Sequence, residues 1–181
     1  MRKINEIFYS LQGEGYYTGT PAVFVRFSGC NLKCSFCDTQ HEEGTLMSDE
    51  EILTEVKKYP AITVILTGGE PSLWIDNEFI EQLHRAGKYV CIETNGTRIL
   101  PDNIDWVTCS PKQGAKVEIT RIDELKVVYE GQDIAVYEHL PATHYFLQPC
   151  SCSNTCETVD CVMHHPKWRL SLQTHKMIDI R

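Results

Sequence analysis

Apolar residues recur along this chain in short runs that polar and turn-forming residues separate. Runs rich in β-branched and aromatic residues are typical of strands, and an almost wholly apolar run is typical of a strand buried on both faces of a parallel sheet. The run at 61–66 has the second character most clearly. We predict strands over residues 22–28, 61–66, 89–92, 106–109, 124–128, 145–147 and 168–172.

Between several of these strands, apolar residues recur every three or four positions, which is the spacing of a helix with one buried face. Ser48, with Glu51 three residues later, forms a capping box that starts one helix, and Pro60 ends it. Gly87 stops the next helix, and Asn154 stands where a residue caps the last one. We predict helices over residues 48–59, 76–86, 131–140 and 154–164.

Alternation of strands and helices predicts a parallel sheet with right-handed helical crossovers. A complete eight-stranded α/β barrel typically needs about 250 residues, and this chain has 181. We therefore expect one α/β domain over residues 1–181, built as a compact, truncated (β/α)6-type partial barrel, with an open doubly wound sheet as the alternative. Both architectures bind ligands at the carboxyl ends of their strands, so we expect the active site there.

Composition and charge narrow the class of protein. Hydrophobic residues make up 42% of the chain and charged residues 23%, as in ordinary globular proteins. No segment approaches the roughly 18 unbroken apolar residues of a membrane span, and the first residues lack the apolar core of a signal peptide. The net charge of −8 argues against a nucleic-acid partner. We expect a cytoplasmic protein without membrane or nucleic-acid partners, whose nine cysteines stay reduced.

Polar and turn-forming residues gather directly after the predicted strands. The segments concerned are the loop that begins at residue 30 and residues 67–71, 93–97, 110–112, 148–149 and 173–176. Glu93 follows an apolar strand, and a buried carboxylate needs a partner, which a ligand can supply. His175 follows the last strand and is a better functional candidate than His41, which we expect to be solvated or structural. This asymmetry between strand ends favours an enzyme.

Three cysteines with the spacing Cys-x3-Cys-x2-Cys lie on the first of these segments, at Cys30, Cys34 and Cys37. A closed structural zinc site takes four protein ligands. Three thiolates leave one coordination position for a ligand that is not protein, and soft thiolates are the ligands of iron–sulfur clusters. The spacing therefore predicts a reactive iron–sulfur centre.

The chain resembles a known family in these residues and several others. The cysteine triplet, with Phe36 before its third member, and the Gly-Gly-Glu-Pro segment at 68–71 resemble the radical S-adenosylmethionine (SAM) superfamily. Further motifs together resemble the 7-carboxy-7-deazaguanine synthase family, and they cover the chain from about residue 4 to its last residue. They lie at residues 10–15, 37–39, 93–97, 110–112 and 169–176.

What this resemblance implies is a ring contraction. The three cysteines would hold a 4Fe–4S cluster, and SAM would bind its open iron and yield a 5′-deoxyadenosyl radical on reduction. The implied substrate is 6-carboxy-5,6,7,8-tetrahydropterin, a small molecule, and the product is 7-carboxy-7-deazaguanine, formed with loss of ammonia on the route to queuosine. The resemblance also implies a flavodoxin- or ferredoxin-type electron donor and a homodimer.

The same resemblance implies roles for single residues. Cys30, Cys34 and Cys37 would bind the cluster, and Thr39 would help to hold Mg2+, which prefers oxygen ligands. The residues implied to contact SAM are Phe36, Gly69, Glu93, Ser110 and Lys112. Those implied to bind the pterin are Gln12, Glu14, Arg26, Thr67, Gly69, His175 and Arg181. No residue is implied as a lone acid or base, because the cluster and SAM carry the chemistry.

Elementary chemistry agrees with two of these roles. The carboxylate of Glu14 offers two oxygens to the N–H groups of an aminopyrimidinone ring. The guanidinium of Arg26 can pair with a carboxylate through two parallel hydrogen bonds. The implied roles of Glu14 and Arg26 therefore both suit a carboxylated pterin.

A second group of cysteines, at Cys150, Cys152, Cys156 and Cys161, has no common metal-binding spacing. An additional metal site and structural cysteines are both open, and we expect the latter. Two other functions remain as alternatives, a small radical SAM activase that makes a glycyl radical on a partner protein and a zinc-bound interaction module. The pterin-binding motifs argue against the first, and the Gly-Gly-Glu-Pro segment argues against the second.

Overall fold

A computed structural model of the chain describes residues 1–35, 37, 39 and 41–181. In this part of the chain the strands form one sheet with the order β3-β1-β2-β4-β5-β6-β7-β8-β9. The strands are β1 Arg2–Leu11, β2 Pro21–Phe27, β3 Thr45–Met47, β4 Thr63–Gly68, β5 Tyr89–Thr94, β6 Trp106–Cys109, β7 Ile122–Tyr129, β8 Ala142–Pro149 and β9 Arg169–Leu170. The helices are α1 Asp49–Lys57, α2 Asn77–Arg85, α3 Thr155–His164 and α4 Thr174–Met177, with 3-10 turns η1 Pro71–Leu73, η2 Ile134–Tyr137 and η3 Cys150–Cys152.

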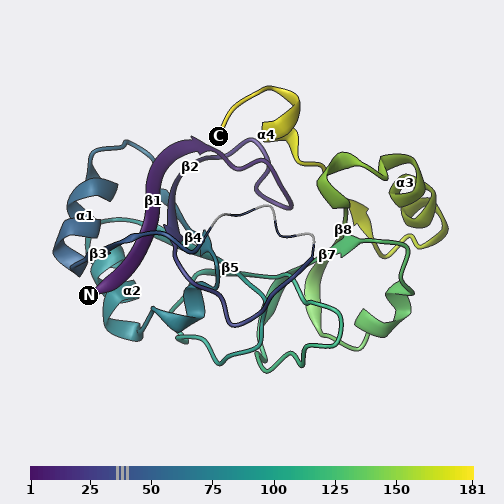
Figure 1. The fold of residues 1–181 in the computed structure, drawn as a ribbon, viewed down its shortest axis with the longest axis horizontal. Helices are drawn as coiled ribbons and strands as arrows, with labels where there is room; N and C mark the ends of the chain where they lie inside the picture. Colours follow the sequence, from purple (N-terminus) through teal and green to yellow (C-terminus); the bar gives the residue numbers. More distant parts are fainter. Residues whose placement is uncertain (36, 38, 40) are drawn as a thin grey trace.

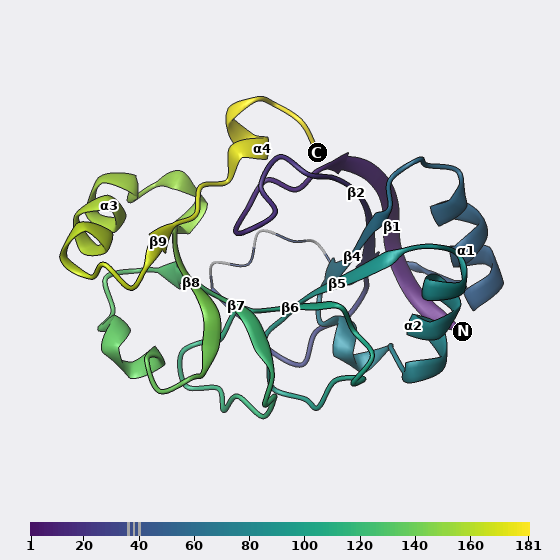
Figure 2. The same cartoon turned by 180° about the vertical axis from the view of Figure 1, so that it is seen from behind.

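The sheet is curved but open, and β3 and β9 are its two edges (Figure 1). β2 and β4 to β9 run parallel, whereas β1 is antiparallel to both β2 and β3. Helices α1 and α2 cover the outer side of one half of the arc, α3 lies outside the other half, and α4 lies near the open side (Figures 1 and 2). This arrangement confirms the expected partial barrel.

The two faces of the sheet carry different side chains, because successive residues of a strand point to opposite faces. On the outer face, Val23 and Val25 of β2 belong to a core that includes the buried residues of α1 and α2. On the inner face, Phe24 and its neighbours Ile65 and Cys91 form a smaller apolar cluster. Nearer the carboxyl ends the inner positions become polar, and these are Arg26, Thr67, Glu93 and Lys126.

Two features of the predicted organisation are wrong. Strand β1 was not predicted, because polar residues interrupt the apolar ones along it and its burial alternates poorly. The β5–β6 and β6–β7 connections contain no helix in the described residues; none of the four predicted helices lies there, but the general expectation of helical crossovers is not met at these two places. Prolines and glycines in these connections, Pro101 and Pro111 among them, disfavour helix formation.

The helix predictions hold in part. The capping box of α1 is confirmed, since the Ser48 hydroxyl accepts from the Glu51 N–H at 3.2 Å. Residues 131–140 form only the short η2 turn. Asn154 precedes α3, but its side chain does not cap that helix. It accepts from the Cys150 N–H and donates to the Tyr129 carbonyl, each at 2.8 Å, and so ties η3 to the end of β7.

In the described part of the chain, no helix combines the length and the apolar character that crossing a membrane requires.

Candidate active site

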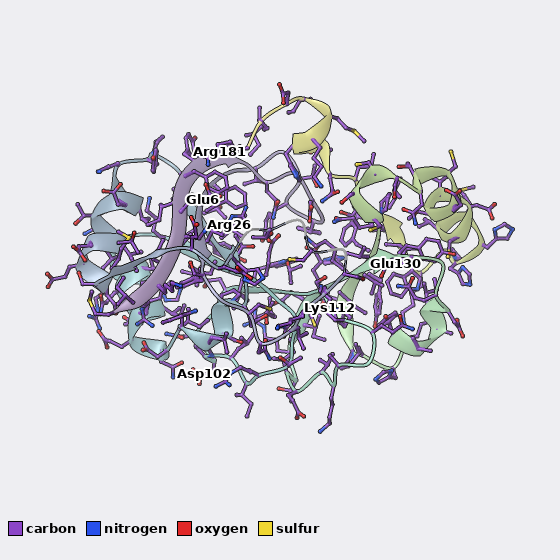
Figure 3. The ribbon with its side chains drawn as sticks, in the orientation of Figure 1. Glu6, Arg26, Asp102, Lys112, Glu130 and Arg181 are labelled. Carbon is purple, nitrogen blue, oxygen red and sulfur yellow. The ribbon has the colours of Figure 1, made fainter. Side chains whose placement is uncertain are left out.

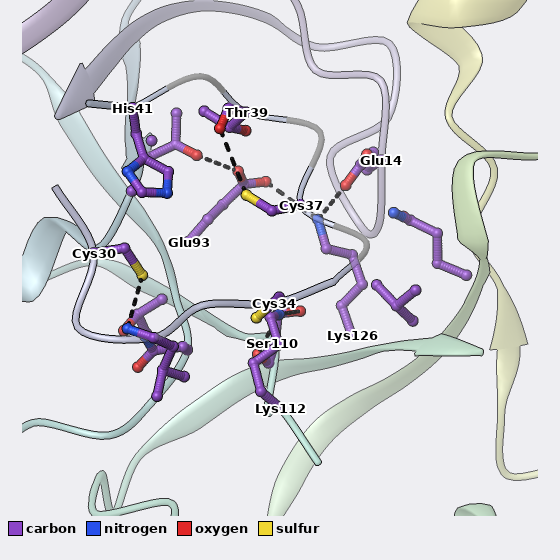
Figure 4. Close-up of a pocket in the computed structure, with 18 of the residues that line it drawn as sticks. Glu14, Cys30, Cys34, Cys37, Thr39, His41, Glu93, Ser110, Lys112 and Lys126 are labelled. Carbon is purple, nitrogen blue, oxygen red and sulfur yellow. Dashed lines mark hydrogen bonds and ion pairs between the residues drawn. The ribbon is translucent and has the colours of Figure 1, made fainter. Parts of the chain in front are cut away.

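The cysteine loop leaves the end of β2 and lines a pocket of about 200 Å³ on the concave side of the sheet (Figure 4). Cys30, Cys34 and Cys37 all contribute to its wall, and all three are free thiols. Thr39 lines the same pocket. Phe36 lies outside the described residues.

Two glycines hold the next strand-end loop against the start of the cysteine loop. The N–H of Gly69 donates to the Phe27 carbonyl at 3.0 Å, and the N–H of Glu70 donates to the Gly29 carbonyl at 2.8 Å. A Cβ on Gly69 would lie 1.9 Å from the Gly29 oxygen, and one on Gly68 would lie 2.4 Å from the Phe27 oxygen. The backbones therefore approach so closely that only glycine fits at either position.

The buried carboxylate of Glu70 links the loop after β4 to the loop after β5. Glu70 is 1% exposed and accepts hydrogen bonds from the Thr94 hydroxyl and the Asn95 N–H, each at 2.7 Å. The Asn95 amide in turn donates to Asn31 of the cysteine loop at 3.0 Å. The loops after β2, β4 and β5 thus hold one another, and the cysteine loop is positioned by its neighbours.

The three thiols fit a cluster better than a single metal ion. Burial raises the pKa of Cys34, although the nearby Lys112 acts in the opposite direction, so a metal must displace its proton. No group of three histidine, cysteine or acidic side chains among the described residues converges on one metal-ion position. A 4Fe–4S cluster needs three thiolates around one cavity, since each binds a different iron. The donor set here meets that requirement.

The same pocket contains the remaining described residues predicted for SAM. These are Gly69, Glu93, Ser110 and Lys112. Lys112 donates to both the carbonyl and the hydroxyl of Ser110 at 2.7 Å. The pocket is also lined by Pro149, Cys150 and Ser151, which the sequence did not assign to it. Ser151 has a φ of 45°, which a non-glycine residue rarely adopts.

A second pocket, of about 880 Å³, adjoins the first. Every residue predicted for the pterin except Gly69 lines it, namely Gln12, Glu14, Arg26, Thr67, His175 and Arg181. Glu14, Thr67 and Glu93 line both pockets, as do Cys37, Thr39, His41 and Gln173. The predicted cofactor and substrate residues therefore meet at one shared wall. His41, which we expected to be solvated or structural, belongs to this wall.

A network of charges lies at this shared wall. Glu93 accepts from Gln12 at 3.0 Å, from the Thr67 hydroxyl at 2.8 Å and from the Lys126 ammonium at 3.3 Å. Burial opposes ionisation of Glu93, but Lys126 and these hydrogen bonds lower its pKa to about 2. Glu14 is paired with Lys126 and accepts from the Gln173 amide at 2.8 Å. Glu93 is therefore an ionised acceptor, and Glu14 lies against the same ammonium.

At the far end of the second pocket, one carboxylate is shared by two guanidinium groups. Arg26 donates to Glu6 at 2.9 Å, and Arg181 pairs with the other oxygen of Glu6 (Figure 3). The Arg181 carbonyl accepts from the Ser10 hydroxyl at 2.6 Å, which holds the chain end on β1. Arg26 thus has a partner within the protein, and a substrate carboxylate would compete with Glu6 for it.

Lys126 is the main site residue that the sequence analysis missed. It lies in β7 between the buried residues Leu125 and Val127 and is itself 5% exposed. A lysine inside an apolar strand is a usable signal, because a buried ammonium requires a charged partner. The partner Glu14 is 112 positions away in sequence, so the signal could not identify it.

Comparison with known proteins agrees with this geometry. Residues 24–108 match the radical SAM superfamily. The chain is 82% identical to a 7-carboxy-7-deazaguanine synthase from Bacteroides thetaiotaomicron over 181 residues, which is the full length of both, and 40% identical to one from Burkholderia multivorans over 98% of each. The chain belongs to the 7-carboxy-7-deazaguanine synthase family. The crystal structure of QueE from Escherichia coli superposes with a TM-score of 0.81 and 30% identity, covering 94% of this chain and 93% of that one.

Membership of the 7-carboxy-7-deazaguanine synthase family makes this chain a radical SAM lyase, whose cofactors are a 4Fe–4S cluster and SAM. It also decides against the glycyl-radical activase and the zinc-bound module. In the described residues the second cysteine group forms no metal-holding group.

Substitution of Gly69 by alanine should loosen the cluster site. The new Cβ would meet the Gly29 carbonyl, and overpacking of this kind typically costs about 1–3 kcal/mol. We expect the reconstituted G69A protein to bind less iron per chain than the wild type and to show weaker cluster absorbance. Gly114→Ala is the control for backbone strain without a clash, because the φ of Gly114 is +78° but nothing lies within 4 Å of its Cβ position. Iron content equal to that of the wild type would show that the close approach does not hold the loop.

Proposed function

We propose that this enzyme, as a single domain over residues 1–181, converts 6-carboxy-5,6,7,8-tetrahydropterin into 7-carboxy-7-deazaguanine and ammonia by radical ring contraction, on the route to queuosine and related deazapurines. The observation that carries the proposal is the pair of joined pockets. One contains three free thiols, the other contains acceptors and guanidinium groups suited to a carboxylated pterin, and Glu14, Thr67 and Glu93 line both.

The cofactor side of the site follows from the first pocket. When bound, the reduced cluster and SAM supply a 5′-deoxyadenosyl radical that removes a hydrogen atom from C6 of the substrate. Cys30, Cys34 and Cys37 would hold the cluster. SAM would lie against Gly69, Glu93, Ser110 and Lys112, with Phe36 beside it. The shared wall then keeps the two ligands next to each other, which shortens the path between reacting atoms.

The substrate side follows from the second pocket. Gln12 and Glu14 would bind the aminopyrimidinone edge, because an ionised carboxylate accepts from two N–H groups at once. Thr67, Gly69 and His175 would contact the ring system.

At the other end of the substrate pocket, Arg26 would bind the substrate carboxylate, with Arg181 beside it. Release of Arg26 from Glu6 is then part of substrate binding. Thr39 lines both pockets and would help to hold Mg2+, which prefers oxygen ligands.

The proposal extends to partners and location. Reduction of the cluster requires a low-potential one-electron donor of the flavodoxin or ferredoxin type, and the exposed Cys37 puts the cluster loop near the protein surface. A homodimer is supported by large apolar side chains exposed near the chain end, such as Met177 and Ile178. The cytoplasm suits free cysteines, which stay reduced there.

The direct test is anaerobic reconstitution with iron and sulfide, followed by addition of reductant, SAM and carboxytetrahydropterin. We expect 7-carboxy-7-deazaguanine and ammonia in equal amounts. Cleavage of SAM without formation of a deazaguanine would retain the radical SAM chemistry and reject the substrate.

Replacement of a cluster ligand should abolish turnover. Cys34→Ala removes one of three thiolates, so we expect no cluster absorbance and no SAM cleavage after reconstitution. Cys156→Ala is the matched control, because Cys156 is an exposed free thiol that lines neither pocket. Equal loss of activity in both variants would contradict the division of the cysteines into two groups.

Replacement of Glu14 should weaken pterin binding without preventing SAM cleavage. Glu14→Ala removes a charged acceptor worth roughly 1.5–3 kcal/mol, so we expect the KM for the pterin to rise at least tenfold while SAM cleavage without substrate persists. Glu118→Ala serves as control, since Glu118 is exposed and lines neither pocket. A KM unchanged by Glu14→Ala would count against the pterin assignment.

A further inference from the structure

We propose that Lys126 is a positioning residue for this reaction, whose ammonium holds Glu14 and Glu93 together at the wall between the cofactor and substrate sites. The proposal rests on the role of Glu14 in pterin binding given above. Lys126 acts through the two carboxylates and does not itself contact the substrate.

The placement of Lys126 gives it this role. Its side chain lines the cluster pocket and is absent from the wall of the second pocket, whereas Glu14 and Glu93 line both. Figure 4 shows its ammonium between the two carboxylates. The lysine therefore reaches the shared wall from the cofactor side, and the carboxylates carry its influence to the substrate side.

Each carboxylate oxygen at this wall has a defined partner. One oxygen of Glu93 accepts from both Gln12 and Lys126, and its other oxygen accepts from Thr67. One oxygen of Glu14 accepts from Gln173, and its other oxygen is paired with Lys126. The three amide and hydroxyl donors are neutral, so among these contacts the lysine supplies the positive charge.

Lys126 contributes the positive charge that balances the carboxylates of Glu14 and Glu93. Two carboxylates at adjacent positions in a partly buried site repel each other, and without a cation one of them takes up a proton. A protonated carboxyl group becomes a donor at one oxygen and loses acceptor capacity. Glu14 could then no longer accept from both N–H groups of the pterin edge.

Two further charged groups, Glu124 and Lys112, lie near Lys126. Glu124, two residues earlier on β7, is a third acidic group near the ammonium and accepts from the Tyr16 N–H at 3.1 Å. Lys112 is the other lysine of the cluster pocket, and its ammonium donates to the carbonyl and the hydroxyl of Ser110. Burial disfavours the charged form of Lys126, yet the three carboxylates outweigh this and raise its pKa. It therefore remains a cation.

The first measurement is pterin binding to reconstituted, unreduced holoenzyme with SAM present. We expect Lys126→Met to raise the dissociation constant for carboxytetrahydropterin roughly tenfold to hundredfold, the worth of a hydrogen bond to a charged acceptor. Lys88→Met is the matched control. It also removes a half-buried ammonium, which donates to the Ala61 carbonyl at 2.6 Å and lines neither pocket, and pterin affinity should not change.

The decisive variant restores the charge balance. In Lys126→Met/Glu93→Gln one cation and one carboxylate are both neutralised, so Glu14 should stay ionised. We expect the double variant to bind the pterin within about threefold of Glu93→Gln alone, whereas a structural role predicts that the losses of the single variants add. Thermal melting of each holoenzyme shows which variants are folded.

Three results would overturn the proposal. They are wild-type pterin affinity in folded Lys126→Met, a double variant that binds at least tenfold more weakly than Glu93→Gln, and an equal loss of affinity in Lys88→Met. If Lys126→Met does not fold, the test is the comparison of the double variant with Glu93→Gln. If the double variant also does not fold, the proposed role is rejected. A different result, wild-type enzyme that binds SAM but no pterin, would reject the proposed function itself. The failure of the two proposals can therefore be told apart.

Discussion

Charged side chains inside a curved sheet must find partners within the protein, because water reaches them poorly and an unpaired buried charge is costly. The loop between β1 and β2 meets this requirement in the present structure. It brings Glu14 to Lys126, the Tyr16 N–H to Glu124 at 3.1 Å and the Gly15 N–H to Ser171 at 2.9 Å. The inner polar groups of β7 and the segment after β9 therefore fix this loop, and with it the substrate pocket.

A second constraint acts on backbones instead of charges. The loop after β4 lies so close to the start of the cysteine loop that side chains are excluded at Gly68 and Gly69. Glu70 then joins this pair to the loop after β5. The three cysteines proposed as cluster ligands thus lie on a loop that has little regular structure of its own and is held by its neighbours. Such support from a surrounding shell is what keeps a reactive site in one geometry.

The two constraints meet at Glu93. Its strand, β5, leads into one of the two loops that hold the cysteine loop, and its carboxylate accepts from Thr67, Gln12 and Lys126. A radical enzyme must keep its cofactor and substrate close and exclude other reactions. A wall of hydrogen-bonded charges between two joined pockets serves both needs, since each member is oriented by the others before any ligand binds.

The sequence by itself predicted the three cysteines as cluster ligands and the partial barrel, and it displayed the glycine pair and the polar strand ends. Each of these depends on local spacing or on the alternation of apolar residues, which the chain displays directly. Tertiary structure alone decided that Glu14 pairs with Lys126, that Glu6 holds both Arg26 and Arg181, and that β1 joins the sheet antiparallel to β2. The apolar pattern around Lys126 indicates that this residue is buried, but it does not identify its charged partner. That partner comes from a segment distant in sequence, which only the folded chain brings close.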